Sequence, residues 1–141
     1  MDNTIKLNVT LDCSEPIYNS TVKVYIGLDK ALLAKELNKE YPENCFLYPD
    51  WCDAFHVSIP QTRKHYIWLE TYNPLDSNDI ATLAHEVIHY AMSVLNSAGI
   101  PVDKDHDEAL THLFYYTFNY LLLELGKANG SGRKTSKVQV P

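Results

Sequence analysis

The sequence predicts a single α+β domain, in which strands and helices occupy separate stretches of the chain. Three observations lead to this expectation. The chain has 141 residues, enough to bury a hydrophobic core without disulfides. Its composition, 45% hydrophobic and 21% charged, is that of a globular protein and not of a disordered one. The patterns of apolar residues give the order β-β-α-β-β-α-α, which lacks the regular βαβ repeat of a parallel sheet.

The first part of the chain predicts two strands followed by a helix. Residues 4–11 and 21–28 alternate apolar and polar side chains, as half-buried strands do, and the segment between them is rich in turn-forming residues. Asp29 is a suitable N-cap for a helix over 30–41, where leucines recur at helical spacing. An aromatic loop with prolines, 42–53, follows this helix.

The next part predicts two short strands and a long helix. The strands cover 54–59 and 65–70 and are separated by a polar turn. The helix covers about 78–97, with Asp76 or Ser77 as its N-cap, and a Gly-Ile-Pro sequence ends it. Its expected buried face consists of the apolar residues Ile80, Leu83, Ala84, Val87, Ile88, Ala91 and Leu95.

The last helix and the tail that follows it differ in character. Residues 106–125 are apolar on nearly all sides of the predicted helix, and a homo-oligomer is left open because one small domain offers limited cover. Residues 127–141 show no periodicity and carry four basic residues, so we expect a flexible basic tail. The folded domain is therefore assigned to residues 1–126.

The charge distribution argues against nucleic acid as a partner. The net charge is −6; residues 1–126 hold all 18 acidic and 8 of the 12 basic residues, which gives −10, and the tail adds +4. An acidic domain binds phosphate poorly.

The chain has no apolar run of membrane-spanning length and no signal-peptide pattern, so we expect neither a membrane partner nor export. Its three cysteines form no CxxC pair, which fits free thiols in a reducing cytoplasm.

A metal-binding motif lies in the middle of the helix at 78–97. His85-Glu86-Val87-Ile88-His89 is an HExxH sequence. Residues four apart share one face of a helix, so both imidazoles can reach one metal ion. Zinc binds neutral imidazole nitrogen, and its catalytic sites use three protein ligands and a water. Glu86 stands beside the first ligand, where it can take a proton from that water. We therefore expect Zn²⁺ at His85 and His89, with Glu86 as the catalytic base.

A third ligand is expected near the start of the last helix, where the chain turns back towards the motif. Acidic residues at this place also stabilise a helix N-terminus through its dipole, which is their ordinary role. His56 and His65 are single histidines in strands and are interpreted as structural, although His65 gains weight if its strand borders the cleft. The candidate donors at the helix start are Asp105, His106, Asp107, Glu108 and His112.

The segment LAHEVIHYAMSVLNSAGIPVDKDHDEALTHLFYY resembles the gluzincin branch of the zincin metallopeptidases, in which HExxH lies on one helix and a glutamate on the next. It most resembles the minigluzincins and the small single-domain HExxH proteins of phage and prophage genomes. The order of strands, backing helix, strands and motif helix also resembles the minimal zincin core. The resemblance implies a zinc metallopeptidase in which His85, His89 and Glu108 bind the metal and Glu86 is the base. Eighteen residues separate His89 from Glu108, as the gluzincin pattern requires.

The resemblance further implies that the strand at 65–70 is the edge strand along which an extended peptide substrate binds. The chain departs from the gluzincin pattern in one respect. Full-size gluzincins have a second subdomain, which often supplies a Tyr or His that stabilises the oxyanion of the tetrahedral intermediate. Little chain remains here after Glu108 to supply such a residue. His112 is the expected substitute as a catalytic residue, because it shares a helix face with Glu108; Tyr115 and Tyr116 are the alternatives.

A second function of another class stays open, that of an inactive zincin-fold protein. Such a phage accessory or assembly protein would act by binding another protein instead of cleaving it. The binding surface would be the apolar last helix or the aromatic loop, whose ring residues are Tyr41, Phe46, Tyr48 and Trp51.

Overall fold

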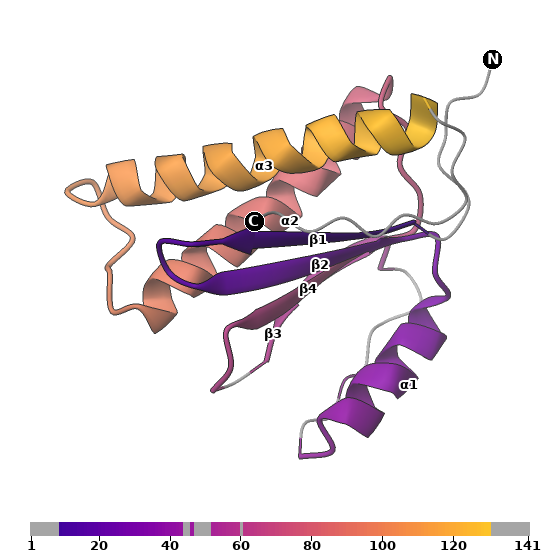
Figure 1. The fold of residues 1–141 in the computed structure, drawn as a ribbon, viewed down its shortest axis with the longest axis horizontal. Helices are drawn as coiled ribbons and strands as arrows, with labels where there is room; N and C mark the ends of the chain where they lie inside the picture. The colour runs from indigo at the N-terminus through magenta and orange to yellow at the C-terminus, as the bar shows by residue number, and fades with distance from the viewer. Residues whose placement is uncertain (1–8, 44–45, 47–51, 60, 131–141) are drawn as a thin grey trace.

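The computed structural model describes residues 9–43, 46, 52–59 and 61–130. These residues form an α+β fold, as predicted, with a four-stranded sheet and three helices (Figure 1). In chain order the elements are β1 (Val9–Glu15), β2 (Ser20–Ile26), α1 (Lys30–Glu40), β3 (Ala54–Ser58), β4 (Lys64–Leu69), α2 (Ser77–Ser97) and α3 (Asp107–Gly130).

The sheet is mixed and has the strand order β1-β2-β4-β3. The pairs β1–β2 and β3–β4 are antiparallel hairpins, whereas β2 and β4 run parallel. This parallel pair arises because the chain passes through α1 and β3 before it returns to β2. Among the described strands, β1 and β3 are therefore the edges, and β4 lies inside. The prediction that the strand at 65–70 is an edge strand is wrong.

The first hairpin lies further along the chain than the sequence predicts. Residues 12–15 were expected in a turn, but they belong to β1, and residues 4–8 of the predicted strand lie outside the described residues. The strand continues because Cys13 and Glu15 extend the buried face of β1 opposite Val22 and Ser20 of β2. The turn is thus confined to residues 16–19 and closes at Asn19, whose φ of 54° is left-handed.

Helices cover the two faces of the sheet unequally. On one face α2 and α3 pack over a core that includes Leu11, Val24 and Ile67. On the other face α1 covers β3 and β4. Its contact cluster comprises Leu33, Leu37, Phe46, Phe55, Ile59, Tyr66 and Trp68. Because β4 is interior, its side chains from His65 to Leu69 are buried on both faces.

The two ends of α2 follow the prediction closely. The Asp76 carboxylate accepts a hydrogen bond from the Asn78 N–H at 2.8 Å, which identifies the N-cap. At the other end Gly99 has a φ of 75°, and the Ile100 N–H donates to the Leu95 carbonyl at 2.9 Å. A Gly99 N–H bond to the Asn96 carbonyl at 3.1 Å completes a Schellman motif. These signals are local, so the sequence alone locates both ends.

The buried face of α2 differs from the predicted one at Ile88, which is 41% exposed. Glu86, Tyr90 and Val94 are buried instead. The helix packs against the sheet and α3 together, so its buried stripe includes polar positions that hydropathy alone does not select. This rotation leaves His85 and His89 on the exposed side.

Helix α3 is longer than predicted and continues to Gly130, four residues into the expected tail. Leu113, Leu121 and Leu125 form its buried stripe. Lys127 pairs with Glu124 at 2.9 Å on the last turns. The remainder of the predicted tail, residues 131–141, lies outside the described residues. No helix in the described part of the chain is long and apolar enough to span a bilayer.

The described cysteines are free thiols. Cys13 is fully buried in the core, and burial raises its pKa to about 12; Cys52 is half-buried. Cys45 lies outside the described residues. Cys13 therefore acts as a small hydrophobic residue with an unreactive thiol.

Candidate metal centre

Helix α2 brings the two motif histidines together on its exposed side. The Nε2 atoms of His85 and His89 are 3.1 Å apart, and the rings meet edge to face with 4.7 Å between their centroids. Two imidazole nitrogens on a tetrahedral zinc at 2.0–2.1 Å are about 3.3 Å apart. The two nitrogens therefore converge at nearly the separation that one zinc ion requires.

Glu86 lies on the buried side of α2. Its side chain is buried, with 6% of the residue exposed, whereas its neighbours His85 and His89 are exposed. Burial raises the pKa of the carboxyl group, and the two imidazoles lower it. The carboxylate thus stands at the boundary between the histidine pair and the dry interior, a suitable position for moving a proton.

A second histidine pair lies beneath α2, on the inner side of β3 and β4. His56 Nε2 and His65 Nδ1 are 3.1 Å apart, and Tyr90 of α2 lies edge-on against the His65 ring. The Tyr90 hydroxyl is 2.7 Å from Ser20 Oγ. Burial lowers the pKa of His56 to about 3, with smaller contributions from His65 and His89, and burial lowers that of His65 to about 4. Both rings are therefore neutral at pH 7, so one donates its proton to the other.

Glu108 and His112 lie together on the exposed side of the first turns of α3. Glu108 Oε2 and His112 Nε2 are 3.5 Å apart, and both side chains are more than three-quarters exposed. In the described part of the chain, no three His, Cys, Asp or Glu side chains are arranged to hold one metal ion. The structure brings His85 and His89 together, but not Glu108 with them. Coordination by Glu108 requires the first turn of α3 to approach α2, so its role stays a prediction.

The strand that borders α2 at the sheet edge is β3. His56 pairs in register with Ile67, a residue of the core beneath α2 and α3, so His56 lies on that face of the sheet. Within the described residues, β4 is the strand paired with β3, which leaves the outer edge of β3 open. The sequence led us to expect the strand at 65–70 at this edge. Strand order depends on pairing between distant segments, so the pattern within one strand does not reveal it.

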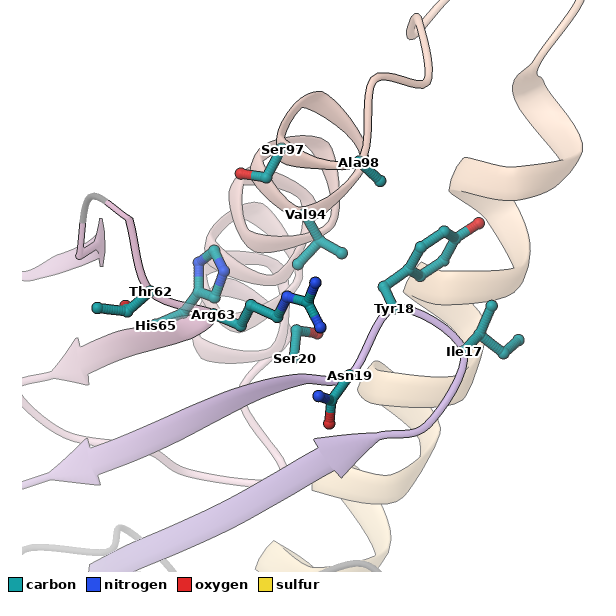
Figure 2. Close-up of a pocket in the computed structure, with 10 residues that line it drawn as sticks. All are labelled: Ile17, Tyr18, Asn19, Ser20, Thr62, Arg63, His65, Val94, Ser97 and Ala98. Carbon is teal, nitrogen blue, oxygen red and sulfur yellow. The ribbon is translucent and has the colours of Figure 1, made fainter.

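A cavity of about 270 Å³ opens at the C-terminal end of α2, between the β1–β2 turn and the β3–β4 turn (Figure 2). Arg63 extends into it from the β3–β4 turn, and Val94 and Ser97 form its helical wall. His65 also lines it, which places the cavity next to the buried histidine pair. The sequence does not reveal this site, since its lining comes from three separate segments: the β1–β2 turn, the β3–β4 turn and the end of α2. Each of the two turns contains one residue with a left-handed backbone, Asn19 and Gln61.

No protein-family model, curated protein or solved structure matches the chain.

Proposed function

We propose that this domain is a zinc-dependent peptidase built on the HExxH motif of α2. The observation that carries the proposal is the convergence of His85 Nε2 and His89 Nε2 at 3.1 Å beside the buried Glu86 carboxylate. The donors fit zinc in type and spacing, although only two of the three expected ligands meet. A bound Zn²⁺ would lower the pKa of a coordinated water and polarise the scissile carbonyl.

The residues of the chain have distinct parts in this chemistry. His85 and His89 bind the metal as neutral imidazoles, on consecutive turns of a helix that is capped at both ends. Glu86 accepts a proton at its carboxylate from the attacking water and gives it to the departing amide nitrogen. Its burial limits its conformational freedom and its contact with bulk water.

Within the described residues the outer edge of β3 is unpaired, and this edge supports a peptide as the substrate. A strand at a sheet edge presents backbone N–H and C=O groups that can pair with an extended peptide. β3 runs for five residues next to α2, and its residue His56 lies near enough to His89 for their charges to interact. A peptide added to this edge would thus pass alongside the histidine pair.

The first test measures zinc content and peptide hydrolysis on the same preparations. We expect about one zinc per chain in the wild type, loss of zinc in His85→Ala, and retained zinc in Glu86→Gln with hydrolysis reduced at least ~100-fold. Glu36→Gln is the matched control, because Glu36 is an exposed glutamate of α1, which packs on the opposite face of the sheet. A wild-type protein that takes up no zinc, or a Glu86→Gln variant that cleaves normally, would contradict the proposal.

The third ligand is tested by the zinc affinity of Glu108→Ala. If Glu108 reaches the metal, its removal weakens zinc binding by at least ~10-fold, measured by competition with a chelating dye. Asp105→Ala removes a neighbouring exposed carboxylate and should leave the affinity unchanged. Unchanged affinity in Glu108→Ala excludes Glu108 as a ligand without affecting the assignment of His85 and His89.

His112→Ala, by contrast, should lower turnover while zinc stays bound if His112 stabilises the oxyanion.

Protein binding without catalysis is the second candidate function, and one surface favours it. An apolar groove of about 400 Å³ lies between the β1–β2 turn and α3, with Ile17 and Tyr115 strongly exposed along it. The aromatic loop favours it less, because Phe46 is buried and Tyr41 is half-buried; Tyr48 and Trp51 lie outside the described residues. Retained zinc with no cleavage of any peptide in a library would select this candidate.

A further inference from the structure

The cavity at the end of α2 contains the cation of Arg63, an exposed residue, and no acidic side chain among the described residues lines the cavity with it. Figure 2 shows the Arg63 side chain reaching from the β3–β4 turn into the space between Val94 and Tyr18. None of the residues that line the cavity is acidic, and no carboxylate among the described residues pairs with Arg63. This is notable in a chain of net charge −6, where carboxylates are in excess.

The other lining groups complement this cation. Ser97 contributes a hydroxyl group, whereas the Ser20 hydroxyl is already bonded to that of Tyr90; Val94 and Tyr18 supply an apolar wall. At the end of α2, the backbone N–H groups of Ala98, Gly99 and Ile100 bond to the carbonyls of Val94, Leu95 and Asn96. A guanidinium, a hydroxyl group and an apolar wall together suit a carboxylate on a short apolar stem.

The position of the cavity relates it to the candidate metal centre. Ser97 follows His89 by eight residues on the same helix, which is about 12 Å along the axis. An extended peptide advances about 3.3 Å per residue, so this distance corresponds to three or four residues. The turn that carries Arg63 also follows directly after β3, the edge strand proposed to bind the peptide.

We propose that this cavity is a subsite that binds a carboxylate of the peptide through Arg63, three or four residues from the bond at the HExxH motif. The distance to the cleaved bond rests on the proposed function, whereas binding of the carboxylate does not. The carboxylate belongs either to an acidic side chain or to the C-terminus of the peptide. The guanidinium can bind both by the same paired hydrogen bonds.

The test is a binding series with the full-length Glu86→Gln protein, which leaves the peptides intact. Fluorescently labelled octapeptides of otherwise neutral sequence carry one Glu, moved through successive positions, and each has a Gln counterpart with an amidated C-terminus. A separate arm compares free and amidated C-termini in a peptide without Glu. We expect one position, or the free terminus, to bind at least ~10-fold more tightly than its neutral counterpart by fluorescence anisotropy.

Arg63→Gln should abolish this preference and leave the neutral peptides unaffected. Lys64→Gln is the matched control: it removes a positive charge one residue later, from a side chain that lines a different cavity together with Tyr66. The preference should persist in Lys64→Gln. Arg63→Lys should retain only part of it, because an ammonium group lacks the paired geometry.

Three results would overturn the inference. They are the absence of any preference for a carboxylate, a preference that survives in Arg63→Gln, and lower thermal stability of Arg63→Gln with unchanged binding. The last would mean that Arg63 stabilises the C-terminus of α2. Failure of the proposed function is seen separately, as absent zinc and absent cleavage in the wild type. A carboxylate preference that depends on Arg63 would stand in that case too.

Discussion

At the scale of single residues, the structure contains two histidine pairs in contrasting environments. His85 and His89 are exposed and converge at their Nε2 atoms, whereas His65 is buried, His56 is half-buried, and these two are hydrogen-bonded to each other. The first pair is available to a metal ion. The second is shielded by α2 and joined to Tyr90, so it supports the position of the helix that carries the first.

The buried pair predicts a loss of stability in mild acid. Burial lowers the pKa of His65 to about 4, and an unfolded histidine titrates near 6.5. Below pH 6.5 the unfolded chain therefore binds more protons than the folded one. The contribution present at pH 7 is lost as the pH falls to about 4, which amounts to ~3 kcal/mol for His65. His56 faces His65, His89 and Tyr90 and acts in the same direction.

Urea unfolding at pH 7.0 and pH 5.0 measures this effect. The free energy of unfolding should fall between the two pH values in the wild type and fall less in His56→Gln/His65→Gln. His106→Gln, which removes an exposed histidine, is the control and should behave as the wild type. An equal fall in the double variant would mean that other groups cause the acid sensitivity.

Local residue patterns also explain how far the candidate site could be predicted. The HExxH spacing places His85 and His89 on one helix face, and the structure has them together. Glu108 depends on the path of the chain between two helices, which spacing does not determine, and the structure leaves it with His112. Arg63 has no motif at all, because its cavity exists only when both turns and α2 have assembled.

At the scale of elements, caps were predictable and strand order was not. Asp29 and Asp76 were found as N-caps because each carboxylate bonds to N–H groups within three residues. The edge position of β3, in contrast, depends on pairing between β2 and β4, where Val22 lies opposite His65. Periodicity within a strand carries no information about which distant strand it joins.

The Schellman end of α2 predicts opposite effects for two glycine substitutions. Gly99→Ala should lower the free energy of unfolding by about 1 kcal/mol, because φ at this position is left-handed. Gly126→Ala is the matched control within α3; no atom lies within 4 Å of the added Cβ, so it should raise stability by ~0.5–1 kcal/mol. Chemical denaturation of both variants gives the comparison. A stabilising Gly99→Ala would contradict the cap assignment.

At the scale of the whole molecule, the candidate sites share one side of the sheet. The histidine pair, the Arg63 cavity and the apolar groove involve α2, α3 and the two turns, while α1 packs on the opposite face (Figure 1). These sites are formed by the elements that enclose the larger core, so each exists only in the folded domain. Binding at any of them should therefore raise the free energy of unfolding of the domain.

Zinc should raise the melting temperature of the wild type, because a metal that binds only the folded state stabilises it. At a hundredfold excess over the dissociation constant the gain is about 2.7 kcal/mol, or several degrees for a domain of this size. Differential scanning fluorimetry with zinc, with magnesium and after chelation makes the measurement. Magnesium, which prefers oxygen ligands, should have little effect, and His85→Ala should not respond to zinc. Equal shifts in wild type and His85→Ala would place zinc elsewhere.

The bond between Ser20 and Tyr90 joins residues that are 70 positions apart, and the parallel pairing of β2 with β4 spans about forty. Contacts this distant form late, because the entropy of closing a long loop has to be offset by many native contacts at once. The hairpin β1–β2 and the individual helices can form earlier from near neighbours. We therefore expect the layer that supports His85 and His89 to form only in the final stage of folding. If this pair binds zinc as proposed, the time at which zinc is taken up in a refolding experiment should mark that stage.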